Sequence, residues 1–195
     1  MIAMAKRNEF KPDKPRSGLL DKLVLTQKQR RSVLRWGLYA LLLLALSVLQ
    51  DVLLCRVRLF GATTELVPCG IFLVCLTEGL EKGSVFSLIA SCVYLFSGTA
   101  AGNYSIVFIT ALSIGVTLFR QSYLQKSFSS TMLCAAVAML VYQLVIFLIG
   151  VFFGMTTFGR IFSHLLTGIM TLIAAPILYY IVTAISTLGG EAWKE

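Results

Sequence analysis

The chain has 195 residues, of which 57% are hydrophobic and 13% charged, with a formal net charge of +8. Soluble domains carry about 25% charged residues, so this composition excludes an ordinary soluble core and indicates one compact membrane domain. Ten of the 17 Lys and Arg residues lie within the first 35 positions. Basic segments beside a membrane span stay cytoplasmic and attract anionic lipid. Because no nucleic-acid-binding motif accompanies them, we expect no nucleic-acid partner.

The charge distribution divides the chain into three parts. Residues 1–32 are predicted to form a basic cytoplasmic arm, residues 33–187 the membrane domain, and residues 188–195 a short polar tail. Within the arm, residues 19–31 place leucines on one helical face and charges on the remainder. This segment has two interpretations: a short helix lying on the inner leaflet, or an extension of the first span.

Six apolar segments follow the arm. In chain order they cover residues 36–54, 66–77, 84–96, 104–119, 131–153 and 161–186. The first would reach roughly 28 Å as a helix, about the thickness of the hydrocarbon layer. The second and third are much shorter, and we expect them to form a helical hairpin that longer helices shield, as short spans or partly re-entrant. The predicted fold is therefore an all-α integral membrane bundle of about six transmembrane segments, two of them short.

The stretch at residues 78–103 is the predicted inner seam of this bundle. Gly83, Ser87 and Ser91 recur every four residues and would form one small-residue stripe, which allows helix backbones to approach closely in a bilayer. The alternative is that any membrane helix rich in Ser and Gly shows such a stripe. Small residues on the later segments extend the predicted helix-packing seam. They are Ala111, Gly115, Cys134, Ala138, Thr167, Thr171 and Ala175.

Basic residues also predict the orientation of the chain. If the N-terminus is cytoplasmic and all six segments cross, 14 of the 17 Lys and Arg residues lie inside and three outside. This excess predicts that both termini are cytoplasmic. If one short segment does not cross, the C-terminus changes sides. Trp36 and Tyr39 are expected at the inner interface, and Glu78 and Glu81 in a solvated inner loop.

Residue types that perform chemistry are sparse. The single histidine, His164, is interpreted as a membrane-interface residue rather than a catalyst. The five cysteines stand singly in apolar runs, which is unlike a metal site or a disulfide framework. Asp51 is interpreted as a carboxylate that reaches the headgroups or pairs with Arg56 or Arg58, the alternative being a functional acid. The sequence therefore predicts no catalytic residue, cofactor or metal site, and a non-enzymatic protein.

Several short motifs occur in a recognisable order. LSVLQDVLL ends the first span, LFGATTEL forms the turn after it, and EGLEKGSVFSLIA, FSGTAAGNYS and a final span with the sequence APILY follow. Their order and spacing resemble the rod shape-determining protein MreD family of bacterial inner-membrane proteins. The positions that carry this resemblance are Gln50, Phe60, Gly61, Glu65, Leu66, Gly98, Gly102, Pro176 and Tyr179.

The resemblance implies a membrane scaffold of the bacterial cell-elongation machinery. Such a protein binds the bitopic protein MreC and helps to join actin-like MreB filaments to peptidoglycan synthases, so membrane lipid and an MreC-like protein are the expected partners. The resemblance also implies a fold similar to the six-helix substrate subunits of energy-coupling-factor transporters. A substrate-binding subunit for a vitamin or metal is accordingly the alternative function.

Overall fold

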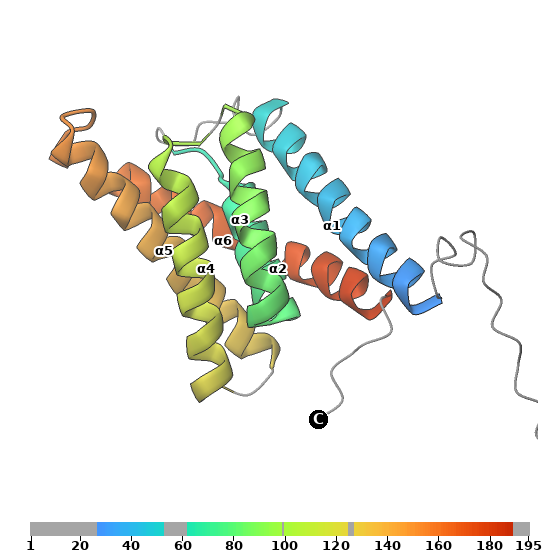
Figure 1. Ribbon diagram of the computed structural model, residues 1–195. Helices are drawn as coiled ribbons and strands as arrows, with labels where there is room; N and C mark the ends of the chain where they lie inside the picture. The colour runs from blue at the N-terminus through green and yellow to red at the C-terminus, as the bar shows by residue number, and fades with distance from the viewer. Residues whose placement is uncertain (1–26, 53–61, 99, 125–126, 189–195) are drawn as a thin grey trace, which may run out of the picture.

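The computed structural model describes residues 27–52, 62–98, 100–124 and 127–188. This part of the chain is built from α-helices, as the sequence predicts (Figure 1). The helices are α1 Gln27–Val52, α2 Leu66–Glu78, α3 Leu80–Phe96, α4 Tyr104–Tyr123, α5 Phe128–Phe152 and α6 Ile161–Leu188, with a short 3-10 helix η2 at Phe158–Arg160. Each predicted apolar segment falls on one helix, although α1, α3 and α4 each extend several residues beyond the predicted bounds. Residues 1–26 of the predicted arm, residues 53–61 of the first outer loop and residues 189–195 of the tail lie outside the described residues. Helix α1 begins at Gln27 and so includes residues 27–32, the end of the predicted arm.

Four of these helices, α1, α4, α5 and α6, are long and apolar enough to cross a membrane. Their outward faces carry large apolar side chains such as Leu44, Leu148 and Ile173, each more than half exposed. An aqueous surface rarely displays so many side chains of this kind together. The helices are thus consistent with a multi-pass membrane protein.

Successive helices run in alternating directions, so the beginning of α1 and the end of α6 lie at the same end of the bundle (Figure 1). Helices α2 and α3 are separated by one residue, Gly79, which has a φ of 88°. This left-handed conformation is easily adopted only by glycine. The tight link produces the predicted helical hairpin.

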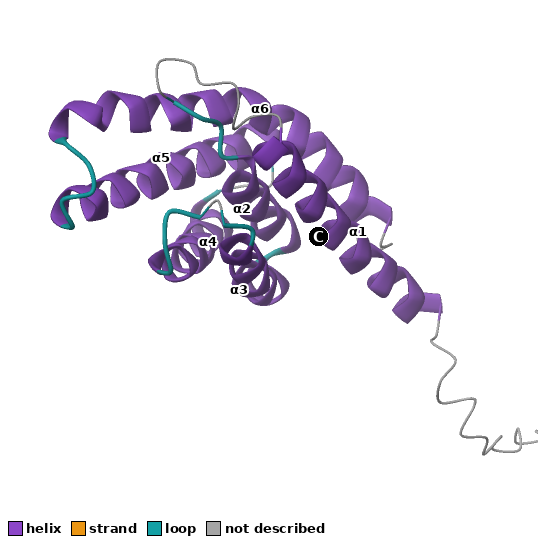
Figure 2. Ribbon diagram, turned by 90° about the horizontal axis from the view of Figure 1, so that it is seen from above, coloured by secondary structure: helices purple, strands orange, loops and turns teal. Residues whose placement is uncertain are grey.

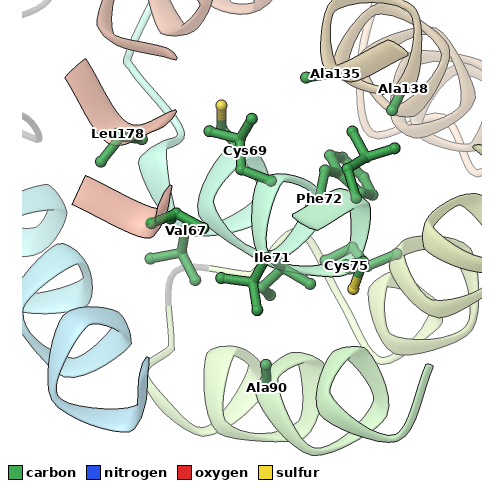
Figure 3. Packing of buried hydrophobic residues seen from close by; sticks show 14 of the residues in the cluster. Val67, Cys69, Ile71, Phe72, Cys75, Ala90, Ala135, Ala138 and Leu178 are labelled. Atoms are coloured by element: carbon green, nitrogen blue, oxygen red, sulfur yellow. The ribbon is translucent and has the colours of Figure 1, made fainter. Parts of the chain in front are cut away.

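The helix at the centre of the bundle is α2. Eleven consecutive residues, Leu66 to Leu76, are buried, and the helix contacts all five other α-helices, which surround it when seen from above (Figure 2). Ile71 points toward Ala90 of α3, whereas Phe72 points toward α5 (Figure 3). Because α2 has no polar face, contact with apolar neighbours on every side is its favourable environment.

The other helices are therefore arranged around α2 and not, as predicted, around the seam at residues 78–103. Helix α3 covers one side of α2 and exposes Val85, Ile89 and Val93 on its opposite side. The physical reason is the length and composition of α2. Its 13 residues reach only about 20 Å, so the surrounding helices must shield its ends as well as its sides.

Small residues do bring α3 close to α2. Gly83 is buried, and a Cβ placed on it would lie 2.9 Å from the Cα of Cys75. Ser87 and Ser91 continue the same buried stripe. The predicted seam residues on α5 and α6 are buried as well; they are Cys134, Ala138, Thr167, Thr171 and Ala175.

The predicted packing pair on α4 is wrong. Ala111 and Gly115 are exposed, and no atom lies within 4 Å of a Cβ placed on Gly115. The stripe that α4 buries consists instead of Ser105, Ile109, Ser113 and Thr117. Two stripes on α4 recur every four residues, and small size alone does not distinguish the one that faces the protein.

Candidate functional site

Both ends of α2 lie among other helices, which creates a hydrogen-bonding problem. The first N–H groups and the last C=O groups of a helix have no partner within the helix. Inside a membrane bundle water cannot supply those partners, so side chains must do so. We call the two resulting groups of side chains the N-terminal cluster, which comprises Gln50, Glu65, Gln143 and Thr171, and the C-terminal cluster, which comprises Arg35, Tyr39, Glu78 and Arg120.

In the N-terminal cluster, neutral oxygens receive the first N–H groups of α2. The N–H of Val67 donates to Gln50 Oε1 of α1 at 3.1 Å. The N–H of Glu65, the residue before the helix, donates to Thr171 Oγ1 of α6 at 3.0 Å. Thr171 in turn donates to the C=O of Thr167. Residues from α1 and α6 thereby hold the same end of α2.

The Glu65 side chain has a different partner. It makes no capping hydrogen bond to α2, and its Oε2 accepts a hydrogen bond from Gln143 Nε2 of α5 at 3.0 Å. Gln143 is only 1% exposed, and its Oε1 has no partner among the described residues. The glutamate itself is partly exposed. The carboxyl group therefore joins α2 to α5 through a single amide.

Glu65 is bound by residues that lie far from the ends of α5 and α6. Gln143 is nine residues from the end of α5 and Thr171 is ten residues from the start of α6, which are distances of roughly 14 to 15 Å along each helix. Ionisable side chains at such depth in a membrane protein are expensive, and a functional role is the first hypothesis for them.

The C-terminal cluster is ionic. Arg35 Nη1 of α1 lies 3.4 Å from Glu78 Oε2, and the two side chains are 6% and 4% exposed. The Tyr39 hydroxyl donates to the other carboxylate oxygen of Glu78 at 2.7 Å. Arg120 of α4 donates through Nη1 to the C=O of Leu76. Cations are favoured at the C-terminus of a helix, where unpaired carbonyls concentrate negative charge.

Two sequence predictions fail at this cluster. Glu78 is the last residue of α2 and its carboxylate is buried, whereas the prediction placed it in a solvated loop. Tyr39 is fully buried instead of lying at the interface. Both differ for the same reason, since each side chain is the other's hydrogen-bonding partner inside the bundle. Glu81, in contrast, is exposed.

The sequence of α1 carries a signal for both clusters. Its buried face begins with Arg35 and Tyr39, continues through Leu43 and Leu46, and ends with Gln50. These positions share one helical face, and its polar ends are 15 residues, or about 22 Å, apart. That separation is close to the length of α2. The pattern indicates a short buried helix lying alongside, with Arg35 and Gln50 at its two ends.

Only some of the positions that carry the family resemblance are close together in the structure. Gln50, Glu65 and Leu66 meet at the N-terminus of α2. Gly98 and Gly102 lie between α3 and α4, and both have positive φ angles. Phe60 and Gly61 lie outside the described residues. Pro176 lies inside α6, and the Tyr179 ring contacts Phe128.

Other reactive residue types are dispersed. His164 is half-buried, with its ring 5.6 Å from that of Phe147. In the described part of the chain, no three His, Cys, Asp or Glu residues are grouped as metal ligands. The thiol of Cys75 donates to the C=O of Gly83 at 3.1 Å, which ties α2 to α3. The polar clusters at the ends of α2 are therefore the candidate functional sites.

The fold and the two clusters define the class of this protein. It is an α-helical bundle with membrane-like character, built around a short buried helix whose two ends form hydrogen bonds with neighbouring helices. No protein-family model, curated protein or solved structure matches the chain.

Proposed function

We propose that this protein is a non-enzymatic membrane scaffold of the bacterial cell-elongation machinery. It would bind an MreC-like bitopic protein and, through it, connect actin-like MreB filaments with peptidoglycan synthases. The proposal combines the ordered motifs that resemble the MreD family with the multi-pass character of the four long helices.

The observation that carries the proposal is how the bundle uses its internal polar groups. Gln50 and Thr171 receive backbone N–H groups at the start of α2. Arg35, Glu78 and Arg120 bond to one another or to the backbone at its other end. A site for a drug-sized ligand requires several polar groups that converge on an open cavity. Here most of these groups hold α2 in place, as a scaffold requires.

Orientation follows from the arrangement of charges. Arg30, Lys82 and Arg120 belong to helix ends on the same side of the bundle, whereas Arg160 belongs to the opposite side (Figure 1). By the excess of basic residues on the cytoplasmic side, we propose that the former side faces the cytoplasm. Both termini would then be cytoplasmic, in the bacterial inner membrane.

Co-purification tests this function. The tagged protein, extracted in mild detergent from cells that also express an MreC-like bitopic protein, is expected to retain that protein through affinity and size-exclusion steps. An unrelated single-span protein expressed at the same level is the control. Equal recovery of both single-span proteins, or of neither, would overturn the proposal.

A transporter substrate subunit remains the second candidate, and one observation favours it. The Oε1 of buried Gln143, beside Glu65, is an acceptor without a described partner, as expected where a ligand supplies the donor. Equilibrium binding of thiamine, biotin and riboflavin to the purified protein discriminates the two functions. Tight, saturable binding of one vitamin would favour the transporter subunit.

A further inference from the structure

The pairing of Glu65 with Gln143 leaves hydrogen-bonding capacity unused. An amide placed side by side with a carboxyl group can form two hydrogen bonds, one from its N–H and one to its C=O. Only the first is present, from Gln143 Nε2 to Glu65 Oε2 at 3.0 Å. Gln143 Oε1 is buried and lacks a donor within the described residues. A buried acceptor without a donor destabilises the fold.

A negative charge on Glu65 would be poorly compensated. The N–H of Val67 in α2 donates to Gln50, and the N–H of Glu65 itself donates to Thr171, so neither group stabilises the carboxylate. The ion pair found in the described residues lies at the other end of α2, between Arg35 and Glu78. An unpaired charge at this depth is expensive, and such groups become neutral instead.

Among the residues that the structure describes, the titratable groups around Glu65 supply no fixed positive charge. On α5, Tyr142 interacts electrostatically with Glu65, and Tyr104 of α4 interacts with Tyr142. On α1, the titratable residue next to Gln50 in the chain is Asp51, which is an acid and carries no positive charge. On α6, the nearest titratable residue to Thr171 in the chain is His164, about two turns away.

We propose that Glu65 is a proton-binding site. The protonated carboxyl group donates its O–H to Gln143 Oε1 while it accepts the existing bond from Gln143 Nε2, so that acid and amide form a closed pair. The proton is taken up from bulk solvent on the side where Glu65 is partly exposed, and no other bond is made or broken. Both oxygens of the pair and the amide are then satisfied.

Release of this proton weakens the join between α2 and α5. The ionised carboxylate has no O–H to donate, and the buried Gln143 Oε1 then lacks a donor again. In the unfolded chain a glutamate releases its proton near its ordinary pKa of about 4.3. A fold that keeps the acid neutral is therefore most stable at low pH, and this contribution declines as the pH rises. The inference requires a membrane bundle but no particular partner.

Thermal unfolding of the full chain in detergent across about pH 5 to pH 9, a range above the ordinary glutamate pKa, tests the proposal. The control variant is Glu65→Gln, because the amide imitates the neutral acid and titrates nowhere in this range. The melting temperature of the wild type, minus that of Glu65→Gln, is expected to fall as the pH rises. Subtracting the two melting temperatures at each pH removes the contributions that other titrating groups make to both proteins. A difference that stays constant or rises with pH would overturn the proposal.

Infrared spectroscopy gives a second readout that does not need the variant to fold. At about pH 6, where ordinary carboxyl groups are ionised, the wild type is expected to show the C=O band of a protonated carboxylic acid. Glu81→Gln, at an exposed position, should retain the band. Where Glu65→Gln folds, the band should be absent. A wild-type spectrum without this band at pH 6 would refute the proton site.

Discussion

The two ends of α2 solve the same problem with different chemistry. At the C-terminal cluster the solution is ionic, with the buried pair Arg35–Glu78 and the contact of Arg120 with the Leu76 carbonyl. At the N-terminal cluster it is neutral, with the Gln50 and Thr171 oxygens receiving N–H groups. A helix N-terminus attracts anions as strongly as a C-terminus attracts cations, so the dipole alone does not explain why the described residues form an ion pair at only one end.

The difference lies in the charge that each end must accommodate. Glu78 places a carboxylate near the negative end of α2, where it would be unfavourable without a cation. Arg35 compensates it, and Arg120 adds a second positive charge close by. At the other end Glu65 is directed to an amide and not to the helix. The C-terminal cluster thus depends on charge, whereas the N-terminal cluster depends on hydrogen bonds.

The largest expected effect is loss of the ion pair. Glu78→Ala leaves the buried Arg35 without its carboxylate, and removal of one partner of a buried pair costs about 3 to 5 kcal/mol. A thiol-reactive dye can monitor thermal unfolding in detergent, because Cys69, Cys75 and Cys134 are free, buried thiols. We expect a strongly lowered melting temperature or loss of the folded protein.

The matched control for this variant is Glu81→Ala. Glu81 is three residues further along the chain and exposed, so its removal should leave the melting temperature nearly unchanged. A double variant with Arg35→Met and Glu78→Leu should recover part of the stability, since two apolar side chains leave no buried charge. If Glu78→Ala and Glu81→Ala melt alike, the C-terminal cluster is not stabilised by charge.

Added volume at the helix contacts should have an intermediate effect. Ala138→Leu on α5 enlarges a side chain that is 0% exposed, and overpacking of this kind costs about 1 to 3 kcal/mol. Ala111→Leu is the matched control, because Ala111 is exposed on α4. Melting temperatures from the same dye assay should fall only for Ala138→Leu. Equal effects would show that close packing at Ala138 is unimportant.

The sequence predicts the helices well because apolar runs and their breaks are local features. The apolar run predicts a short helix at residues 66–77, and α2 occupies Leu66–Glu78. Its central position was missed because a hydrophobic pattern shows that a face is buried but not which helix covers it. The pair Arg35–Glu78 joins residues 43 positions apart. Charges so far apart in sequence have no local signature beyond the spacing of Arg35 and Gln50.

The smallest expected effect is at the neutral end. Thr171→Val preserves the shape of the side chain but removes the oxygen that accepts the Glu65 N–H. Hydrogen bonds of this kind in membrane bundles contribute about 0.6 kcal/mol on average, and loss of a neutral bond rarely exceeds about 1.5 kcal/mol. A small decrease in melting temperature, well below that of Glu78→Ala, is therefore expected.

Thr187→Val provides the comparison for that measurement. Thr187 is exposed near the end of α6 and bonds to a carbonyl of its own helix, so its replacement should not lower the melting temperature. A decrease for Thr171→Val as large as that for Glu78→Ala would mean that the neutral contacts hold α2 as firmly as the ion pair. The two clusters would then differ in their chemistry but not in how much each stabilises the fold.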